Sequence, residues 1–219
     1  MVNLSKYIKE SLLDDEDIVF NDDNIKPEIK KFIEDNYRCV QFTISNKPNK
    51  DGKFVVDGKT VQVINKNITS LTNNLFIWGK VKGEFNCSKC DSLTSLEGAP
   101  EKTDGRFSCN SCNSLTSLKG APKKVNGRFD CSYCHSLETL EGAPEKLSES
   151  FFCSYCNSLT SLEGAPKEVG ESFFCSCCKY LTSLEGAPEK IGGGFICIGN
   201  KFSIKDIKKV VKAIYIKIR

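Results

Sequence analysis

Cysteine is the residue type in this chain with the most obvious capacity for chemistry. The sequence contains 13 cysteines and a single histidine, His135. Two cysteine series recur every 22 residues, one with six members and one with five. Their first four members form a C-x2-C-x18-C-x2-C pattern, made by Cys87, Cys90, Cys109 and Cys112. This spacing is typical of a zinc ribbon, so a metal site is one interpretation of the pattern.

A ladder of free, buried thiols is the other interpretation, and the sequence favours it. Five complete C-x-x-C pairs leave one pair unmatched if each metal ion takes two pairs. The last repeat has Asn200 in place of its second cysteine, and Asn65 lies in the first, irregular repeat. Asn and Cys can both donate to a backbone carbonyl, whereas the exchange would remove a zinc ligand. We therefore expect no metal and no other cofactor; the ligands of a zinc site, if one formed, would be Cys87, Cys90, Cys109 and Cys112.

The remaining reactive groups are few. Cys177 lies outside both series, at the exit of a predicted strand. It is the candidate reactive thiol, with a neutral surface substitution as the alternative. One histidine and no G-x-S-x-G, H-E-x-x-H or phosphate-loop pattern leave no nucleophile–base pair. We therefore predict that the protein is not an enzyme.

Charge and hydropathy bound the possible partners and the location. The 31 basic and 28 acidic residues give a net charge of +3, which is too small to demand a nucleic-acid or membrane partner. No run approaches the roughly 18 apolar residues that cross a bilayer. The first ten residues lack the apolar run and cleavage site of a signal peptide. We expect a cytoplasmic protein, in which reducing conditions disfavour disulfides.

The cysteines belong to a longer repeated unit. It reads F-x-C-x-x-C-x-x-L-x-x-L-x-G-A-P, as over residues 107–122, and recurs every 22 residues. A fixed period of this kind is the signature of a solenoid, whose coils bury their apolar residues against one another. Alternation at Phe107 and Cys109 predicts a short strand that pairs in parallel with the next coil. The predicted fold class is α+β, a 22-residue-repeat solenoid with a parallel β-strand face, an N-terminal α+β cap and a C-terminal capping helix.

The unit resembles the cysteine-containing type of leucine-rich repeat, L-x-L-x-x-C-x-x-L-T. Residues 107–109 stand for L-x-L, Cys112 for the N/C position and Leu115-Thr116 for L-T. The S-L-T-S-L-E-G-A-P wording of residues 92–100 is also similar to uncharacterised repeat proteins of bacteriophages and low-GC bacteria. The resemblance implies a protein-binding solenoid. Through the bacteriophage proteins, it also implies a factor that acts in the host cytoplasm and inhibits a host defence protein.

The predicted solenoid spans residues 60–200 and follows an N-terminal α+β cap, residues 1–59. In this cap we expect a short helix around residues 4–12 and a second helix that Pro27 opens. Strand-like runs follow at 40–44, 54–56 and 61–63, and Asp57-Gly58 has the composition of a hairpin turn.

Residues 201–219 are predicted to form a capping helix across the last coil. A capping box at Ser203–Asp206 begins it, and apolar residues recur at helical spacing: Ile204, Ile207, Val211, Ile214 and Ile218. Seven basic residues and one acid give this segment a charge of +6. Its polar face can contact an anionic partner or a membrane surface, or only solvent, and solvent is the simpler interpretation.

Side chains between the inward-facing positions of the strands should reach the surface. One column consists of the residue between the repeated Phe and the first Cys of each coil, and it changes from polar to aromatic along the stack. A second column consists of the residue just before the second Cys of each coil, and it contains two tyrosines. Contiguous exposed aromatic residues are typical of interfaces. We therefore predict a partner-binding surface made by Tyr133, Phe152, Tyr155, Phe174 and Ile196. The alternative is that the C-terminal helix or a loop covers these residues.

The predicted function is a non-enzymatic protein–protein interaction module that binds a macromolecular partner, a protein, through the strand face. A structural or assembly protein is one alternative. A zinc-stabilised nucleic-acid-binding module is the other.

Overall fold

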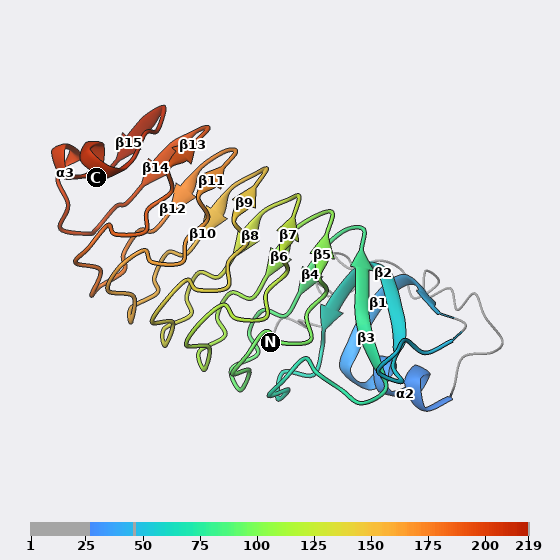
Figure 1. The fold of residues 1–219 in the computed structure, drawn as a ribbon. Coiled ribbons are helices and arrows are strands. Elements are labelled where there is room, and N and C mark those ends of the chain that lie inside the picture. Colours follow the sequence, from blue (N-terminus) through green and yellow to red (C-terminus); the bar gives the residue numbers. More distant parts are fainter. Residues whose placement is uncertain (1–26, 46, 219) are drawn as a thin grey trace, which may run out of the picture.

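The repeats stack into an elongated parallel β-solenoid (Figure 1). The computed structural model describes residues 27–45 and 47–218. Strands one repeat apart lie side by side in parallel, so that Phe107 pairs with Phe129 and Phe151 with Phe173. The predicted solenoid with its 22-residue period and parallel strand face is confirmed. The helix expected around residues 4–12 lies outside the described residues.

Each coil contributes two short strands, which form two columns of parallel pairs. The front ladder contains the repeated Phe and consists of β4 (Phe85–Asn86), β6 (Phe107–Ser108), β8 (Phe129–Asp130), β10 (Phe151–Phe152), β12 (Phe173–Phe174) and β14 (Gly194–Ile196). The return ladder lies on the segment that leads to the next Phe and consists of β5 (Lys102–Thr103), β7 (Lys124–Val125), β9 (Lys146–Leu147), β11 (Glu168–Val169) and β13 (Lys190–Ile191). Only the front ladder was expected from the sequence.

The inward positions of the repeat form continuous columns in the core. In the coil that begins at Phe129, five side chains have no exposed surface: Phe129, Cys131, Cys134, Leu137 and Leu140. The Phe rings stack from coil to coil, and those of Phe151 and Phe173 lie 5.3 Å apart with planes 9° from parallel. Complete burial of a Leu or Phe side chain contributes about 1.5–3 kcal/mol, so these columns hold the coils together.

The Gly-Ala-Pro turn needs a positive φ and a close approach to the preceding coil, and only glycine allows both. Gly120 has a φ of +88°, and a Cβ at this position would lie 2.2 Å from the backbone nitrogen of Glu97 in the preceding coil. Any other residue would meet both the left-handed penalty and a backbone clash. The turn therefore sets how closely neighbouring coils approach.

The N-terminal end is closed by α2 (Pro27–Asn36) and three longer strands, β1 (Tyr37–Ile44), β2 (Phe54–Val63) and β3 (Phe76–Val81). The helix opened by Pro27 is confirmed, but the hairpin at Asp57-Gly58 is wrong. β2 continues through these residues, with a shift of register against β3 between Val56 and Gly58, because it pairs antiparallel with β1 on one side and parallel with β3 and β4. β2 also crosses residues 59 and 60, so the cap and the solenoid share a strand. Trp78 joins the two parts, with its ring 5.1 Å from that of Tyr37 and 5.9 Å from that of Phe85.

The C-terminal end contains α3 (Ile204–Val210) and β15 (Tyr215–Lys217). The predicted capping box of Ser203 and Asp206 is present, but a helix over all of residues 201–219 is wrong. Val211 already has an extended backbone, and β15 then pairs in parallel with β14, aligning Ile216 with Phe195. β15 therefore pairs with the backbone groups at the open edge of β14, which a longer helix would leave without partners. Neither helix of the described residues is long and apolar enough to cross a membrane.

Candidate interaction surface

Two pairs of stacked aromatic rings join neighbouring coils beside the front ladder. The rings of Tyr133 and Tyr155 lie 4.6 Å apart, and those of Phe152 and Phe174 lie 4.5 Å apart, each pair within 5° of parallel. The parallel register of β10 with β12 places the two Phe side chains opposite each other. We call these four residues the aromatic face.

Most of the predicted surface residues are accessible, but one is not. Tyr133 is 46% exposed and Tyr155 is 40% exposed. Phe152 and Phe174 are half-buried. Ile196, which was predicted to belong to this surface, is only 6% exposed. It is buried because β15 adds a further strand beside β14 and aligns Lys217 with Ile196.

The stacking decides which part of each ring meets a partner. In a stacked pair each ring covers only one face of the other, so the ring edges and the outer faces are left for outside contacts. The aromatic face therefore suits aliphatic or aromatic side chains that pack against these edges and outer faces.

The tyrosine column depends on an unusual backbone conformation. Tyr133 and Tyr155 both have a φ of +61°, and the equivalent residues Ser111 and Cys177 have a φ of +56°. A left-handed residue other than glycine costs roughly 1–2 kcal/mol. In the last coil the equivalent position is a glycine, Gly199, with a φ of +74°. This conformation could not be predicted from residue type, because the six equivalent positions, Lys89 included, hold five different residue types.

Cys177 extends the tyrosine column by one coil. It is the half-buried member of the cysteines, and the other 12 are buried. Interaction with the Cys177 side chain raises the pKa of Tyr155. The candidate reactive thiol therefore lies at the border of the aromatic face.

The polar half of the same face is largely occupied by internal contacts. Arg106 forms an ion pair with Asp130 at 3.0 Å. The hydroxyls of Ser88 and Ser108 lie 2.8 Å apart, and Ser108 is fully buried. These groups already have partners within the solenoid, so the aromatic half is the more available contact surface.

The second cysteine series forms a ladder of thiol hydrogen bonds. From the second member of the series onward, each Sγ donates to the carbonyl of the cysteine 25 residues earlier, at 3.1–3.2 Å, in the pairs Cys112–Cys87, Cys134–Cys109, Cys156–Cys131 and Cys178–Cys153. Asn200 makes the same contact with Cys175 through Nδ2, at 2.7 Å. The predicted exchange of Asn for Cys as a carbonyl donor is confirmed at this position. Asn65 differs, since its Nδ2 donates to Oδ1 of Asn36.

Two of the four candidate zinc ligands donate to backbone carbonyls. The thiol of Cys87 donates to the Ser108 carbonyl at 3.4 Å, and that of Cys112 donates to the Cys87 carbonyl at 3.1 Å. Neighbouring thiols raise the pKa of Cys90 and of Cys112. Over residues 27–45 and 47–218, no group of three or more His, Cys, Asp or Glu side chains is placed to hold a metal ion.

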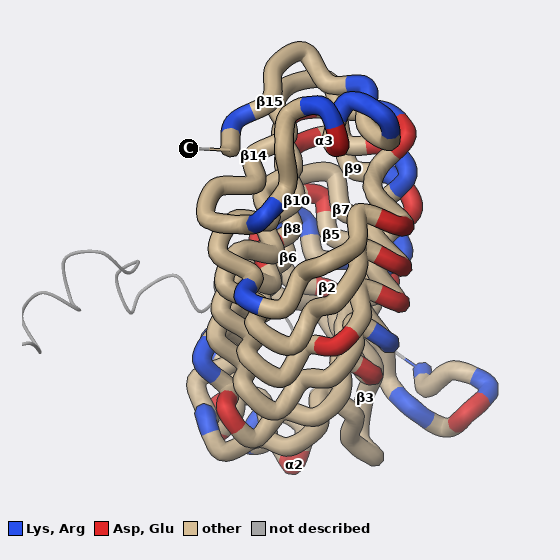
Figure 2. Tube along the Cα trace, turned by 90° about the vertical axis from the view of Figure 1, so that its left-hand side faces the viewer, with Lys and Arg blue, Asp and Glu red and all other residues tan. Residues whose placement is uncertain are grey.

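Several charged side chains outside the aromatic face form ion pairs between coils, and Figure 2 shows how basic and acidic residues are distributed along the stack. Glu168 lies 3.0 Å from Lys146 and 3.3 Å from Lys190, and Glu141 lies 3.2 Å from Lys119. The two lysines, Lys146 first, lower the pKa of Glu168. Such exposed pairs contribute little stability each. Their main consequence is that the sides of the coils carry few uncompensated charges.

Comparison with known proteins adds no relative: no family model, no curated protein and no solved structure matches this chain.

Proposed function

We propose that this chain is a non-enzymatic protein-interaction module that binds its partner protein through the aromatic face. The observation that carries the proposal is the pair of ring stacks, Tyr133 with Tyr155 and Phe152 with Phe174, which remain partly exposed on neighbouring coils. Clustered aromatic residues with solvent access are typical anchors of protein interfaces. Stacking between rigid coils also holds the rings in place before binding, which lowers the entropy lost on association.

A protein partner fits this face better than a nucleic acid does. The two surface columns, made by the residue between the repeated Phe and the first Cys and by the residue just before the second Cys, contain one lysine over residues 86–199, Lys89, and no arginine. Phosphate recognition depends on lysine and arginine. Apolar side chains of a protein need neither.

The resemblance of the repeat supports two finer proposals. The pattern is similar to leucine-rich repeats of the cysteine-containing type, which would make this a protein-binding member of that group. The repeat wording is also similar to bacteriophage proteins, and on this ground alone we propose a host defence protein as the partner and host cytoplasm as the location.

Partner capture with matched surface variants tests the proposal. Tagged wild-type protein, a Tyr133→Ser/Tyr155→Ser variant and a Phe152→Asp/Phe174→Asp variant would be incubated with lysate of the source organism, and bound proteins identified by mass spectrometry. The control is Tyr180→Ser, because Tyr180 is 55% exposed but lies outside the aromatic face. Circular dichroism of each variant would establish that it is folded.

A partner that is lost from both aromatic-face variants and retained by Tyr180→Ser supports the proposal. A partner that all variants retain rules out the aromatic face. Self-association of the wild-type protein that the same variants abolish would support an assembly protein instead. A salt-dependent shift with DNA or RNA would support a nucleic-acid-binding module.

A further inference from the structure

The C-terminal end of the solenoid carries uncompensated positive charge. Over residues 201–218 the chain has six lysines and one acid, Asp206, for a net charge of +5 (6 − 1). Asp206 accepts hydrogen bonds from Ser203 in the cap of α3 and pairs with Lys209 at 3.5 Å. Among the described residues, the other five lysines of this segment form no ion pair: Lys201, Lys205, Lys208, Lys212 and Lys217.

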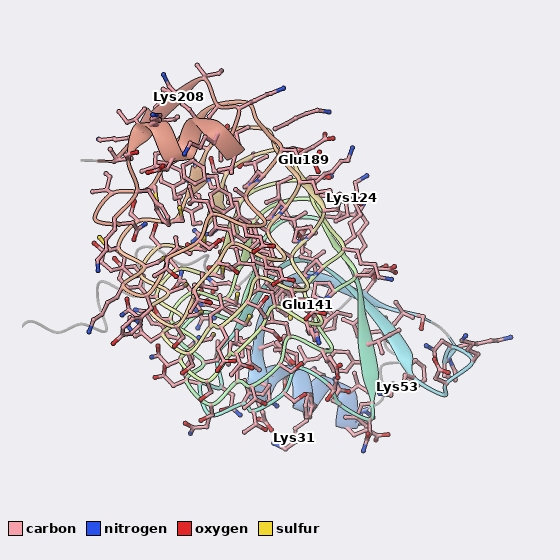
Figure 3. All side chains as sticks on the ribbon, turned by 60° about the vertical axis from the view of Figure 1, so that its left-hand side comes forward. Lys31, Lys53, Lys124, Glu141, Glu189 and Lys208 are labelled. Carbon is pink, nitrogen blue, oxygen red and sulfur yellow. The ribbon has the colours of Figure 1, made fainter. Side chains whose placement is uncertain are left out.

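Lysines along the body of the stack are arranged differently. Seven of them form ion pairs with acids: Lys80, Lys102, Lys119, Lys123, Lys146, Lys167 and Lys190. Figure 2 shows these mixed charges along the coils and mainly basic residues around α3 and β15, and Figure 3 labels Lys208 on α3 at the end of the stack. Lysines without an ion pair also occur elsewhere in the described residues, Lys124 and Lys179 among them, but the segment 201–218 brings five of them together with a single acid.

The same end exposes apolar side chains. Ile204 is 45% exposed, Val210 48%, Ile214 78% and Tyr215 51%. These are four of the nine large apolar side chains that are exposed in the described part of the chain. Residues 204–215 therefore hold nearly half of these exposed apolar side chains, close to lysines that form no ion pair.

A hollow lies at the same end, between the start of α3 and the end of β15. It has a volume of about 550 Å³. Its lining combines the apolar side chains of Phe202, Ile204 and Ile218 with Lys201 and Lys205. This combination suits a group that is apolar at one end and anionic at the other.

We propose that this C-terminal end docks on the surface of an anionic lipid bilayer. Lysines near such a surface are attracted to its phosphate groups, and apolar side chains between them enter the boundary with the acyl chains. A second copy of this chain would bring like charges together. A nucleic acid would satisfy the lysines but leave Ile214 and Val210 exposed to water. A bilayer satisfies both.

The observed end of the chain differs from the single helix that the sequence predicts over residues 201–219. A helix over all of residues 201–219 would bury its apolar residues on the last coil and turn its lysines to solvent. Because α3 ends at Val210, Ile214 instead lies at a bend between α3 and β15, outside the core. This surface is separate from the aromatic face, so the two proposals can fail independently.

Vesicle co-sedimentation of the full chain tests the proposal. The probes are vesicles that contain phosphatidylglycerol and vesicles of pure phosphatidylcholine. We expect binding only to the former, weakened by salt. Lys205→Glu/Lys208→Glu/Lys212→Glu should lower the affinity by about tenfold or more. The control Lys47→Glu/Lys50→Glu/Lys59→Glu makes the same charge change at the other end, with exposed lysines, and should have a much smaller effect.

A second pair of variants tests the apolar contact. Ile214→Ser should weaken vesicle binding several-fold, whereas Ile77→Ser, at a 38% exposed isoleucine on β3, should not. Absence of binding to anionic vesicles, or equal losses in the two lysine triples, would overturn the proposal. So would wild-type binding by Ile214→Ser. Equal binding to duplex DNA with no effect of Ile214→Ser would identify a general polyanion site instead.

Discussion

Asn200 donates a 2.7 Å hydrogen bond from its Nδ2 to the backbone carbonyl of Cys175. One coil earlier, Cys178 makes the equivalent contact with the Cys153 carbonyl through Sγ, at 3.2 Å. An amide and a thiol thus perform the same structural task in consecutive coils. The second cysteine series therefore acts as a set of compact hydrogen-bond donors inside an apolar core.

The donor role predicts which substitutions the ladder tolerates. Cys156→Asn keeps a donor for the Cys131 carbonyl, which the thiol contacts at 3.2 Å. Cys156→Val has a similar volume and no donor, so it should destabilise the protein by about 1–3 kcal/mol, more than the Asn variant does. Urea unfolding of both variants measures the difference. A Val variant as stable as the Asn variant would show that packing alone accounts for the cysteines.

Stability should fall in alkaline solution. Burial raises the pKa of Cys178 from about 9 to about 12 and also raises the pKa of Cys131, Cys153 and Cys175. A thiol whose folded pKa exceeds its unfolded pKa stabilises the fold fully below the unfolded value, and this contribution is lost as the pH rises through the folded value. Urea midpoints should therefore decrease between pH 9 and about pH 12. A constant midpoint over this range, with the protein still folded, would contradict the buried-thiol ladder.

Cys177 should be the one thiol that reacts readily in the folded protein. It is half-buried while the other 12 cysteines are buried, and the reactivity of a thiol depends on access as well as on its pKa. Titration with a chromogenic disulfide reagent should give about one fast equivalent, with the rest appearing on unfolding in urea. Cys177→Ser should remove the fast phase. A fast phase that survives in this variant would mean that the core thiols open to solvent.

The solenoid was predictable because its core repeats in the sequence. Every coil must supply Phe, Cys and Leu at the same inward positions, so burial in space appears as a 22-residue period in the chain. The return ladder carries a much weaker signal. A strand such as Lys124–Val125 has one apolar residue, and its pairing depends on backbone neighbours rather than on residue type.

At the C-terminal end, the local sequence pattern does not decide between a helix and a strand. Ile207, Val211 and Ile214 recur at helical spacing, but Ile214, Ile216 and Ile218 also alternate as in a strand. The free edge of β14 decides between the two, and only the assembled fold reveals that edge. β15, which pairs with this edge, also buries Ile196, which is why one of the five predicted surface residues is inaccessible. The aromatic columns themselves follow from the repeat, whereas the orientation of their rings does not.

The positive φ angles of the residues just before the second cysteine of each coil allow a prediction about backbone strain. Ser111 has a φ of +56°, so Ser111→Gly removes an unfavourable conformation and should be neutral or stabilise the protein by up to about 1 kcal/mol. Ser117 lies in the same coil and does not have a positive φ. Ser117→Gly should therefore destabilise by about 0.5–1 kcal/mol, because glycine there only gains freedom in the unfolded chain. Urea unfolding of the two variants compares them directly. Equal destabilisation by both would mean that the turn before the second cysteine is not strained, and that Tyr133 and Tyr155 project from the coils without a backbone penalty.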